Sequence, residues 1–283
     1  SETLCKPLQT EDYGIQTMAD VSPPKWHLAH TSWFFETFLL QPYLSGYRVF
    51  HPQFAYLFNS YYEQAGRFHP RPERGLLSRP TVTEVYAYRR HVDRHMLELL
   101  GQRRHPARAA IDSRTQLGLN HEQQHQELLL TDIKHIFARN PLKPVYRDLP
   151  GPSGRTPPPQ QWRDYDAGVY AIGADGSTGF VYDNECPRHK VYLQAFRLAS
   201  RAVTNGEYLE FMAAGGYRCP ELWMSEGWKT VCEQAWQAPL YWERHNERWW
   251  HMTLGGMRPV DPDAPVCHIS FYEADAYARW RGK

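Results

Sequence analysis

An excess of charge of either sign is the first thing that this chain lacks. Its 283 residues include 32 Lys and Arg against 31 Asp and Glu, which gives a formal net charge of +1. Such a balance provides no long-range attraction towards nucleic acid or an anionic membrane, and we expect neither as a partner. No apolar run approaches the roughly 20 residues that cross a bilayer, and the N-terminus has no signal-peptide core. These absences predict a soluble, cytoplasmic protein.

Cysteine is also scarce. The five cysteines are odd in number, and no two of them form a Cys-x-x-Cys pair. We therefore expect reduced thiols rather than a disulfide framework, which agrees with a cytoplasmic location. Aromatic residues, by contrast, are plentiful, with 10 Trp, 18 Tyr and 12 Phe. They suit a compact protein with a substrate cavity, although core packing alone would use most of them.

Helical signals dominate residues 1–140. Ser22 is a good N-cap that is followed by two prolines, and Thr81 and Glu84 have capping-box spacing. We expect three long helices, which run from residue 22 through Phe38, from residue 81 to a C′ residue at Gly101, and from Asp112 or Ser113 to Asn140. With a helical remnant at residues 10–18 they predict a four-helix bundle, a usual setting for metal sites.

The second half of the chain has a different pattern. Residues 141–164 are rich in proline, glycine and arginine, as in an interdomain linker. Residues 165–283 combine short alternating segments, such as 190–198, with helical segments at 204–214 and 271–281. The sequence therefore predicts an α+β protein, in which a helical domain and a mixed domain are joined by a linker.

The stretch His121-Glu-Gln-Gln-His125 carries most of the functional information. Residues i and i+4 are about 40° apart around a helix, so both imidazoles can bind one metal ion. We expect the pair to share an inward-facing stripe with Leu117 and Leu128. A buried histidine pair can also serve packing alone. The Asn, Gln and Glu residues around this pair favour a metal, because polar side chains on an inward stripe are costly unless they serve a site.

The same stretch matches His-Glu-x-x-His, the zinc-protease signature, in which Glu122 would be the general base. The metzincin continuation requires Gly and a third His at two positions where this chain has Leu128 and Thr131. This mismatch disfavours the protease interpretation.

A third ligand has to come from another helix. Glu127 cannot serve, because it lies about 200° around the helix from His125. His30 is the best candidate, on a helix face that is otherwise apolar, although a core histidine that bonds to a carbonyl is the alternative. His27, about 60° away around the same helix, is the runner-up.

Several long motifs in this chain resemble those of a known family. Four segments of the first half are similar to the ergothioneine-biosynthetic sulfoxide synthases, the hercynine oxygenases: 22–36, 58–63, 74–80 and 121–127. Three segments of the second half are similar to the formylglycine-generating-enzyme type of C-type-lectin fold: 184–190, 203–208 and 265–277. The resemblance implies a DinB-like four-helix bundle followed by that lectin-like domain. We expect the second domain to be incomplete, because in the family the chain continues beyond the point matched by Lys283.

The resemblance also implies one Fe(II) ion and an O2-dependent reaction. Position by position, His30, His121 and His125 match the family's three metal-binding histidines, and Gln124 matches a residue that helps to hold hercynine. In the implied reaction, the sulfur of cysteine or γ-glutamylcysteine joins imidazole C2 of hercynine and is oxidised to the sulfoxide. Three neutral imidazoles leave neighbouring coordination positions open, which suits a metal that gathers both substrates and O2.

The long connection over residues 41–80 would supply further site residues. Arg71 and Arg74 are candidates for binding the substrate carboxylates, since guanidinium pairs with carboxylate through two hydrogen bonds; solvated surface arginines are the alternative. Tyr61 and Tyr62 are candidates for a catalytic phenol that donates a proton or hydrogen bond, with packing as the alternative. The stretch around them looks most like the family branch that uses free cysteine, so we favour cysteine as the thiol donor.

Three other functions stay open on the sequence alone. An ovothiol-type synthase would use the same iron architecture on histidine. A zinc hydrolase would use the His-Glu-x-x-His match, and a non-catalytic lectin-like module would keep the helical bundle for structure only. A comparison of substrates, metal analysis and a His121 variant distinguish these functions from the one that we favour.

Overall fold

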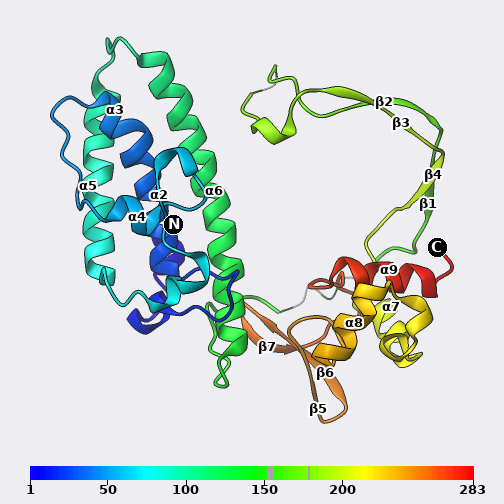
Figure 1. Cartoon of the computed structure of the whole chain (residues 1–283). Coiled ribbons are helices and arrows are strands. Elements are labelled where there is room, and N and C mark those ends of the chain that lie inside the picture. Colours follow the sequence, from blue (N-terminus) through cyan, green and yellow to red (C-terminus); the bar gives the residue numbers. More distant parts are fainter. Residues whose placement is uncertain (152–153, 155, 178) are drawn as a thin grey trace. The chain divides into compact units, whose positions relative to one another are not determined.

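The computed structural model describes residues 1–283 except 152–153, 155 and 178. The chain forms two compact units, Ser1–Arg147 and Asp148–Lys283. The first unit is helical and the second combines helices with short strands (Figure 1). Within the predicted linker 141–164, residues 152, 153 and 155 lie outside the described residues. Among the helices of the described chain, none has both the length and the apolar character that crossing a bilayer requires.

The first unit is built around three long helical segments. Its α-helices are α1 (Glu2–Cys5), α2 (Pro24–Phe35), α3 (Gln41–Tyr43), α4 (Phe54–Phe58), α5 (Val82–Gly101) and α6 (Arg108–Arg139). Shorter turns are the 3-10 helices Thr10–Gly14, Glu63–Ala65 and Arg71–Leu76 and the π-helix Glu36–Leu40, which joins α2 to α3. Helix α2 packs against both α5 and α6 and is buried on nearly every side (Figure 1). A helix that is buried all round belongs in a core, and α2, with its buried polar as well as apolar side chains, lies in the core of this unit.

The predicted helix boundaries are confirmed at some ends and wrong at others. The capping box is present, because Thr81 Oγ1 accepts from the Glu84 amide at 3.2 Å and the Thr81 amide donates to the Glu84 carboxylate at 2.7 Å. Helix α6 begins at Arg108 instead of Asp112, since the Asp112 carboxylate pairs with the Arg108 side chain one turn earlier and does not cap. Gly101 is the last residue of α5 and not a left-handed C′ residue.

The expected helical remnant at residues 10–18 is only in part helical. Residues Thr10–Gly14 form a 3-10 turn, and the following residues leave the helical conformation. The Gln16 side chain explains this departure, because it donates to the Val21 and Arg71 carbonyls and accepts from the Gly75 amide. These bonds hold the segment against a loop. The described residues therefore contain three long helical segments of the predicted four-helix bundle.

The inward stripe of α6 is centred differently from the prediction. Leu117 and Leu128 are 37% and 46% exposed, so they do not share the buried face with the histidine pair. Gly118, Leu129 and Ile136 mark the centre of that face. Leu117 and Leu128 lie about 80–100° away from this centre around the helix, on the far side of His121.

Gly118 sets how closely α6 approaches α2. A Cβ atom at this position would lie 2.7 Å from the ring of Phe35 and 3.0 Å from that of Phe34. Such contacts are too short for carbon atoms, so with a larger residue here either these rings or the two helices would have to move. Because His30 lies on α2 and His121 on α6, this close approach brings the predicted ligands together.

A buried carboxylate ties the end of α2 to its neighbours. Glu36 is 2% exposed and accepts three hydrogen bonds, from Tyr47 Oη at 2.6 Å, the Phe50 amide at 3.0 Å and Tyr88 Oη at 2.6 Å. Burial and Glu36 raise the pKa of Tyr88 well above its ordinary value, so the phenol stays a donor. Three donors satisfy this buried carboxylate, which links the end of α2 to the segment around Tyr47 and Phe50 and to α5.

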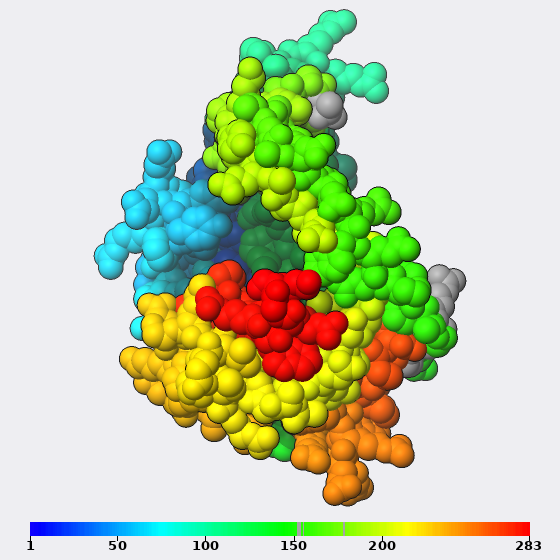
Figure 2. Space-filling model, turned by 90° about the vertical axis from the view of Figure 1, so that its right-hand side faces the viewer, coloured from blue at the N-terminus to red at the C-terminus, as the bar shows by residue number. Residues whose placement is uncertain are grey.

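The second unit is a mixed unit with an aromatic core. Its elements are β1 (Trp162–Tyr165), β2 (Gly168–Ile172), β3 (His189–Leu193), β4 (Phe196–Ala199), α7 (Asn205–Ala213), α8 (Ser225–Gln234), β5 (Trp242–His245), β6 (Arg248–Thr253), β7 (Gly256–Pro259) and α9 (Phe271–Trp280), with short 3-10 turns between them. Strand β1 pairs with β4, β2 with β3, and β6 with both β5 and β7, all antiparallel. The predicted helices at 204–214 and 271–281 are confirmed as α7 and α9. Figure 2 shows α9 in red at the surface of this unit.

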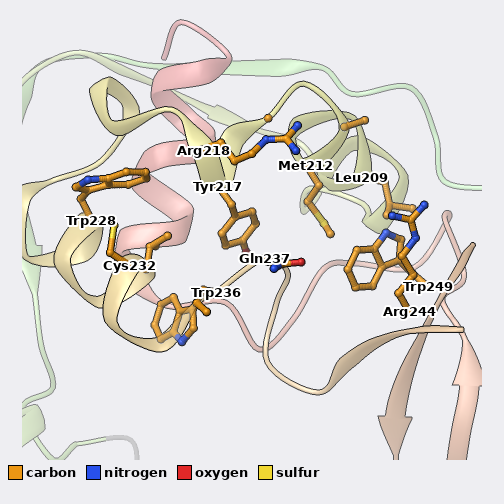
Figure 3. A pocket seen from close by; sticks show the side chains of 14 residues that line it. Leu209, Met212, Tyr217, Arg218, Trp228, Cys232, Trp236, Gln237, Arg244 and Trp249 are labelled. Atoms are coloured by element: carbon orange, nitrogen blue, oxygen red, sulfur yellow. The ribbon is translucent and has the colours of Figure 1, made fainter.

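A cavity of about 750 Å³ lies between α7, α8 and the strands β5 and β6 of the second unit. Figure 3 shows the indole rings of Trp228 from α8, of Trp236 from the segment that follows α8 and of Trp249 from β6 around it. Its lining comes from the second unit alone. None of the predicted site residues belongs to this cavity.

Candidate metal centre

Three buried histidines converge inside the first unit. One ring nitrogen from each of His30, His121 and His125 lies within 4.8 Å of the other two, and no carboxylate of the described residues belongs to this group. The side chains are 1%, 8% and 9% exposed. The ring of His125 lies 4.6 Å from each of the other two rings, centroid to centroid. The structure thus brings together all three predicted ligands, one from α2 and two from α6.

The hydrogen bonds of His30 leave one of its nitrogens for a metal. Its Nδ1 donates to the Phe58 carbonyl at 2.6 Å, so the lone pair is on Nε2. That Nε2 lies 3.2 Å from His121 Nε2. Two imidazole nitrogens that bind one ion at about 2.1 Å, at a right angle, are about 3 Å apart. The separation of the two nitrogens therefore fits a shared ion.

Burial keeps the three imidazoles neutral. It lowers the pKa of His30 well below the ordinary value of 6.5 and lowers the pKa of His121 to about 4. Burial, and then the neighbouring histidines, also lowers the pKa of His125. A neutral imidazole keeps the lone pair that a metal needs, whereas an imidazolium does not. The donor set is ready for a cation at neutral pH.

Aromatic rings and one arginine enclose His30. Trp26 stacks on one side of the imidazole, at 4.5 Å between centroids and 11° between planes, and Trp33 stacks at 5.4 Å and 17°. The Arg74 guanidinium lies 3.4 Å from the Trp26 ring centroid, and its Nη1 donates to Ser22 Oγ at 2.8 Å. Arg74 is only 4% exposed, so the alternative of a solvated surface arginine is wrong for this residue.

The other predicted substrate-binding residues are at the surface. Arg71 lies one turn before Arg74 in the 3-10 helix Arg71–Leu76. It is exposed, and its side chain donates to the Asp20 carbonyl. Gln124 is exposed on α6, directly before His125. Both side chains are accessible to a ligand.

The two predicted tyrosines differ in their distance from the histidines. Tyr62 is half-buried, and its ring centroid lies 6.5 Å from that of His30 and 5.6 Å from that of Trp33. Tyr61 is 76% exposed and stacks on Tyr62 at 5.5 Å. Of the two rings, that of Tyr62 therefore has the contacts with His30 and Trp33.

The two glutamates of the motif point elsewhere. The Glu122 carboxylate accepts from Ser1 Oγ at 2.8 Å and pairs with Arg89. Although burial opposes its ionisation, Arg89 and Ser1 outweigh this effect and lower the pKa of Glu122. A carboxylate held by a guanidinium in this way is a poor general base for a hydrolase. Glu127 is exposed, in agreement with the helix geometry.

The residues that contact the three histidines were not predicted in that role. His27, the runner-up ligand, hydrogen-bonds to both His125 and Asp132 and is not part of the metal group. Asp132 was detectable, because it follows His125 by seven residues and so lies two turns along the same face. Trp26 precedes His30 by one turn and was detectable in the same way. Glu36 gave no signal, since its phenol partners come from distant segments.

Comparisons with known proteins agree with this architecture. The DinB superfamily matches residues 1–129, and the sulfatase-modifying factor enzyme 1-like domain matches residues 155–283. The hercynine oxygenase of Mycolicibacterium smegmatis is 34% identical over 59% of this chain and 38% of its own length, and that of Mycolicibacterium thermoresistibile is 33% identical over 58% and 36%. The formylglycine-generating enzyme of Bos taurus is 31% identical over 47% of this chain and 38% of its own length. The chain thus spans little more than a third of the length of these relatives.

Proposed function

We propose that this chain, a relative of the hercynine oxygenases, is an O2-dependent, non-haem Fe(II) sulfoxide synthase. It joins a DinB-type helical domain to a sulfatase-modifying-factor-type domain. Its substrates are hercynine and cysteine, with γ-glutamylcysteine as the alternative thiol. The imidazole C2–H and the thiol S–H bonds break, and C–S and S–O bonds form. One oxygen atom of O2 enters the sulfoxide, and the other leaves as water with the two hydrogens.

The proposal depends above all on three neutral imidazoles that converge in a group to which no acidic side chain of the described residues belongs. We assign residues 1–140 as the metal-binding domain, 141–164 as a linker and 165–283 to the second domain. His30, His121 and His125 would hold the iron. Bound there, Fe(II) would supply the open coordination positions and the redox chemistry that O2 and a thiolate require.

The surrounding residues have separate tasks in this proposal. Trp26 and Trp33 both stack on the His30 ring, so they help to exclude water and to hold the imidazole in one orientation. Gln124 and Arg71 are exposed and available to bind the polar groups of hercynine and the thiol substrate. Arg74 contributes a buried positive charge close to the site, which favours anionic substrates.

Tyr62 is the better candidate for the catalytic phenol. We expect Tyr62→Phe to lower kcat about a hundredfold, the low end of the range for general acid catalysis, with a KM for hercynine that changes less than about threefold. Tyr61→Phe is the matched control, because the Tyr61 side chain is 76% exposed and should change kcat less than about twofold. Steady-state O2 consumption measures both variants. Equal losses in the two variants would remove the catalytic role of Tyr62.

O2 consumption by the Fe(II)-loaded protein tests the function directly. Hercynine is offered with cysteine, with γ-glutamylcysteine or without thiol, and histidine replaces hercynine in a parallel series. We expect thiol-dependent O2 uptake and a sulfoxide product, identified by mass spectrometry, with hercynine and cysteine. Turnover of histidine, but not of hercynine, would instead indicate an ovothiol-type synthase. Zinc with peptidase activity and no O2 uptake would contradict the iron proposal.

A further inference from the structure

A line of buried hydrogen bonds runs from the backbone to one of the three histidines. The Ser22 amide donates to Asp132 Oδ2 at 2.9 Å, and His27 Nε2 lies 2.8 Å from the same oxygen. On its other side, His27 Nδ1 lies 2.9 Å from His125 Nδ1. Ser22, His27, Asp132 and His125 are 2%, 4%, 7% and 9% exposed. Water therefore has little access to this line, and its hydrogen bonds depend on each other.

The positions of the protons follow from the donors and acceptors. Asp132 Oδ2 already accepts from an amide, and an ionised carboxylate can only accept, so the second bond carries the proton on His27 Nε2. An imidazole that carries a single proton, on Nε2, has its lone pair on Nδ1. The nitrogen that faces this lone pair, His125 Nδ1, has to be the donor. His125 is left with its lone pair on Nε2, the nitrogen on the opposite side of the ring.

We propose that His27 and Asp132 are positioning residues, which hold His125 with its proton on Nδ1 and thereby present Nε2 to the metal. Ligating histidines commonly donate their second N–H to a carboxylate or carbonyl, which fixes the tautomer and the ring orientation. His30 uses the Phe58 carbonyl for this purpose. His125 instead uses the imidazole of His27, which the Asp132 carboxylate orients. We call these two side chains the relay. This inference rests on the metal centre of the proposed function and not on its substrates.

The relay is tested first in the metal-free protein. Long-range ¹H–¹⁵N correlation spectra of the imidazoles report which nitrogen of each histidine carries the proton. We expect His125 with its proton on Nδ1 and His27 with its proton on Nε2 in the wild-type chain. The opposite tautomer of His125 in the wild-type protein would overturn the assignment.

Two substitutions of His27 separate its two hydrogen bonds. The amide oxygen of Asn can occupy the place of imidazole Nδ1, whereas the Gln amide reaches the place of Nε2. His27→Asn should therefore keep an acceptor for His125, and His27→Gln should keep only the bond to Asp132. We expect the affinity for Co(II), titrated under anaerobic conditions, to fall roughly 10–100-fold in His27→Gln and less than about threefold in His27→Asn. The ligand-field bands of bound Co(II) should also change more in His27→Gln than in His27→Asn.

Asp132 gives an independent pair of variants. Both donors use one oxygen, Oδ2, so the amide oxygen of Asp132→Asn can serve both and should keep nearly wild-type Co(II) affinity. Asp132→Leu has a similar shape without an acceptor and should lose roughly 10–100-fold. Combined with His27→Asn, Asp132→Leu should have little further effect on affinity, because Asp132 acts through His27.

His135→Gln is the matched control. His135 lies further along α6 and is 7% exposed, and its Nδ1 is 2.6 Å from Thr17 Oγ1. It should bind Co(II) as the wild type does. Equal affinity in His27→Gln and the wild type would overturn the relay, as would an equal loss in His27→Asn and His27→Gln. Both measurements omit hercynine, thiol and O2, so a failure of the proposed reaction is distinguishable from a failure of the relay.

Discussion

In the His121→Ala variant we expect neither metal binding at the three-histidine group nor turnover of hercynine. A structural zinc site with four ligands is worth about 10–16 kcal/mol, so each ligand contributes roughly 2.5–4 kcal/mol. Loss of one ligand then weakens binding by about 60- to 700-fold. His121 is one of the two ligands that we propose on α6, and Gln124 and Glu127 on the same helix are exposed and cannot replace it. Anaerobic Co(II) and Fe(II) titrations measure the affinity, and O2 consumption measures turnover.

His135→Ala separates this effect from a general loss of structure. His135 is buried on the same helix as His121 but lies outside the metal group. We expect it to retain full metal stoichiometry, even where its thermal stability falls. A His121→Ala protein that keeps both metal and turnover would exclude these three histidines as the metal site, and it would leave the binding-module alternative open.

In the Glu36→Ala variant we expect the first unit to lose about 3–5 kcal/mol of stability. The substitution leaves the phenols of Tyr47 and Tyr88 and the Phe50 amide without their acceptor. Each buried donor without a partner costs about 1–3 kcal/mol, and the removed methylene groups leave a small cavity. Amide hydrogen exchange of α2 and α5 in the intact chain measures this loss separately from the second unit.

Glu36→Gln is the matched comparison. The Gln side chain has nearly the same volume, and its amide oxygen can accept from Tyr47 and Phe50 while its NH2 group meets Tyr88. We expect a loss of about 1–2 kcal/mol, the difference between a charged and a neutral acceptor. If Glu36→Ala were as stable as Glu36→Gln, the three hydrogen bonds would contribute little and α2 would be held by apolar packing alone.

The sequence predicts those parts of the site that repeat along one helix. The spacing of His121 and His125 is a local signal, and the exclusion of Glu127 follows from helix geometry alone. His30 required a choice between a ligand and a core histidine, and the resemblance to a family guided that choice. The structure places its Nε2 3.2 Å from His121 Nε2. Its role as a ligand remains a proposal that the titrations above test.

Contacts between side chains that are far apart along the chain could not be predicted from the sequence. Arg74 stacks on Trp26 and bonds to Ser22, although nothing in a run of basic residues separates a buried arginine from exposed ones. Likewise, Leu117 and Leu128 fit an ideal apolar stripe with His121, but the neighbouring helix packs against a face that is turned away from them. The period of a helix gives relative angles, and only the packing partner decides which angle points inward.

The missing side chain at Gly118 has a consequence for how this metal centre can change. The packing between α2 and α6 depends on a position outside the histidine group, because an added methyl group there would lie 2.7 Å from the ring of Phe35. A substitution at residue 118, which does not contact the ion, could therefore change the size of ion that the proposed centre prefers. A search for variants with altered metal preference would do well to include residues 118 and 35 together, as a spacer that can be widened while all three imidazoles remain in place.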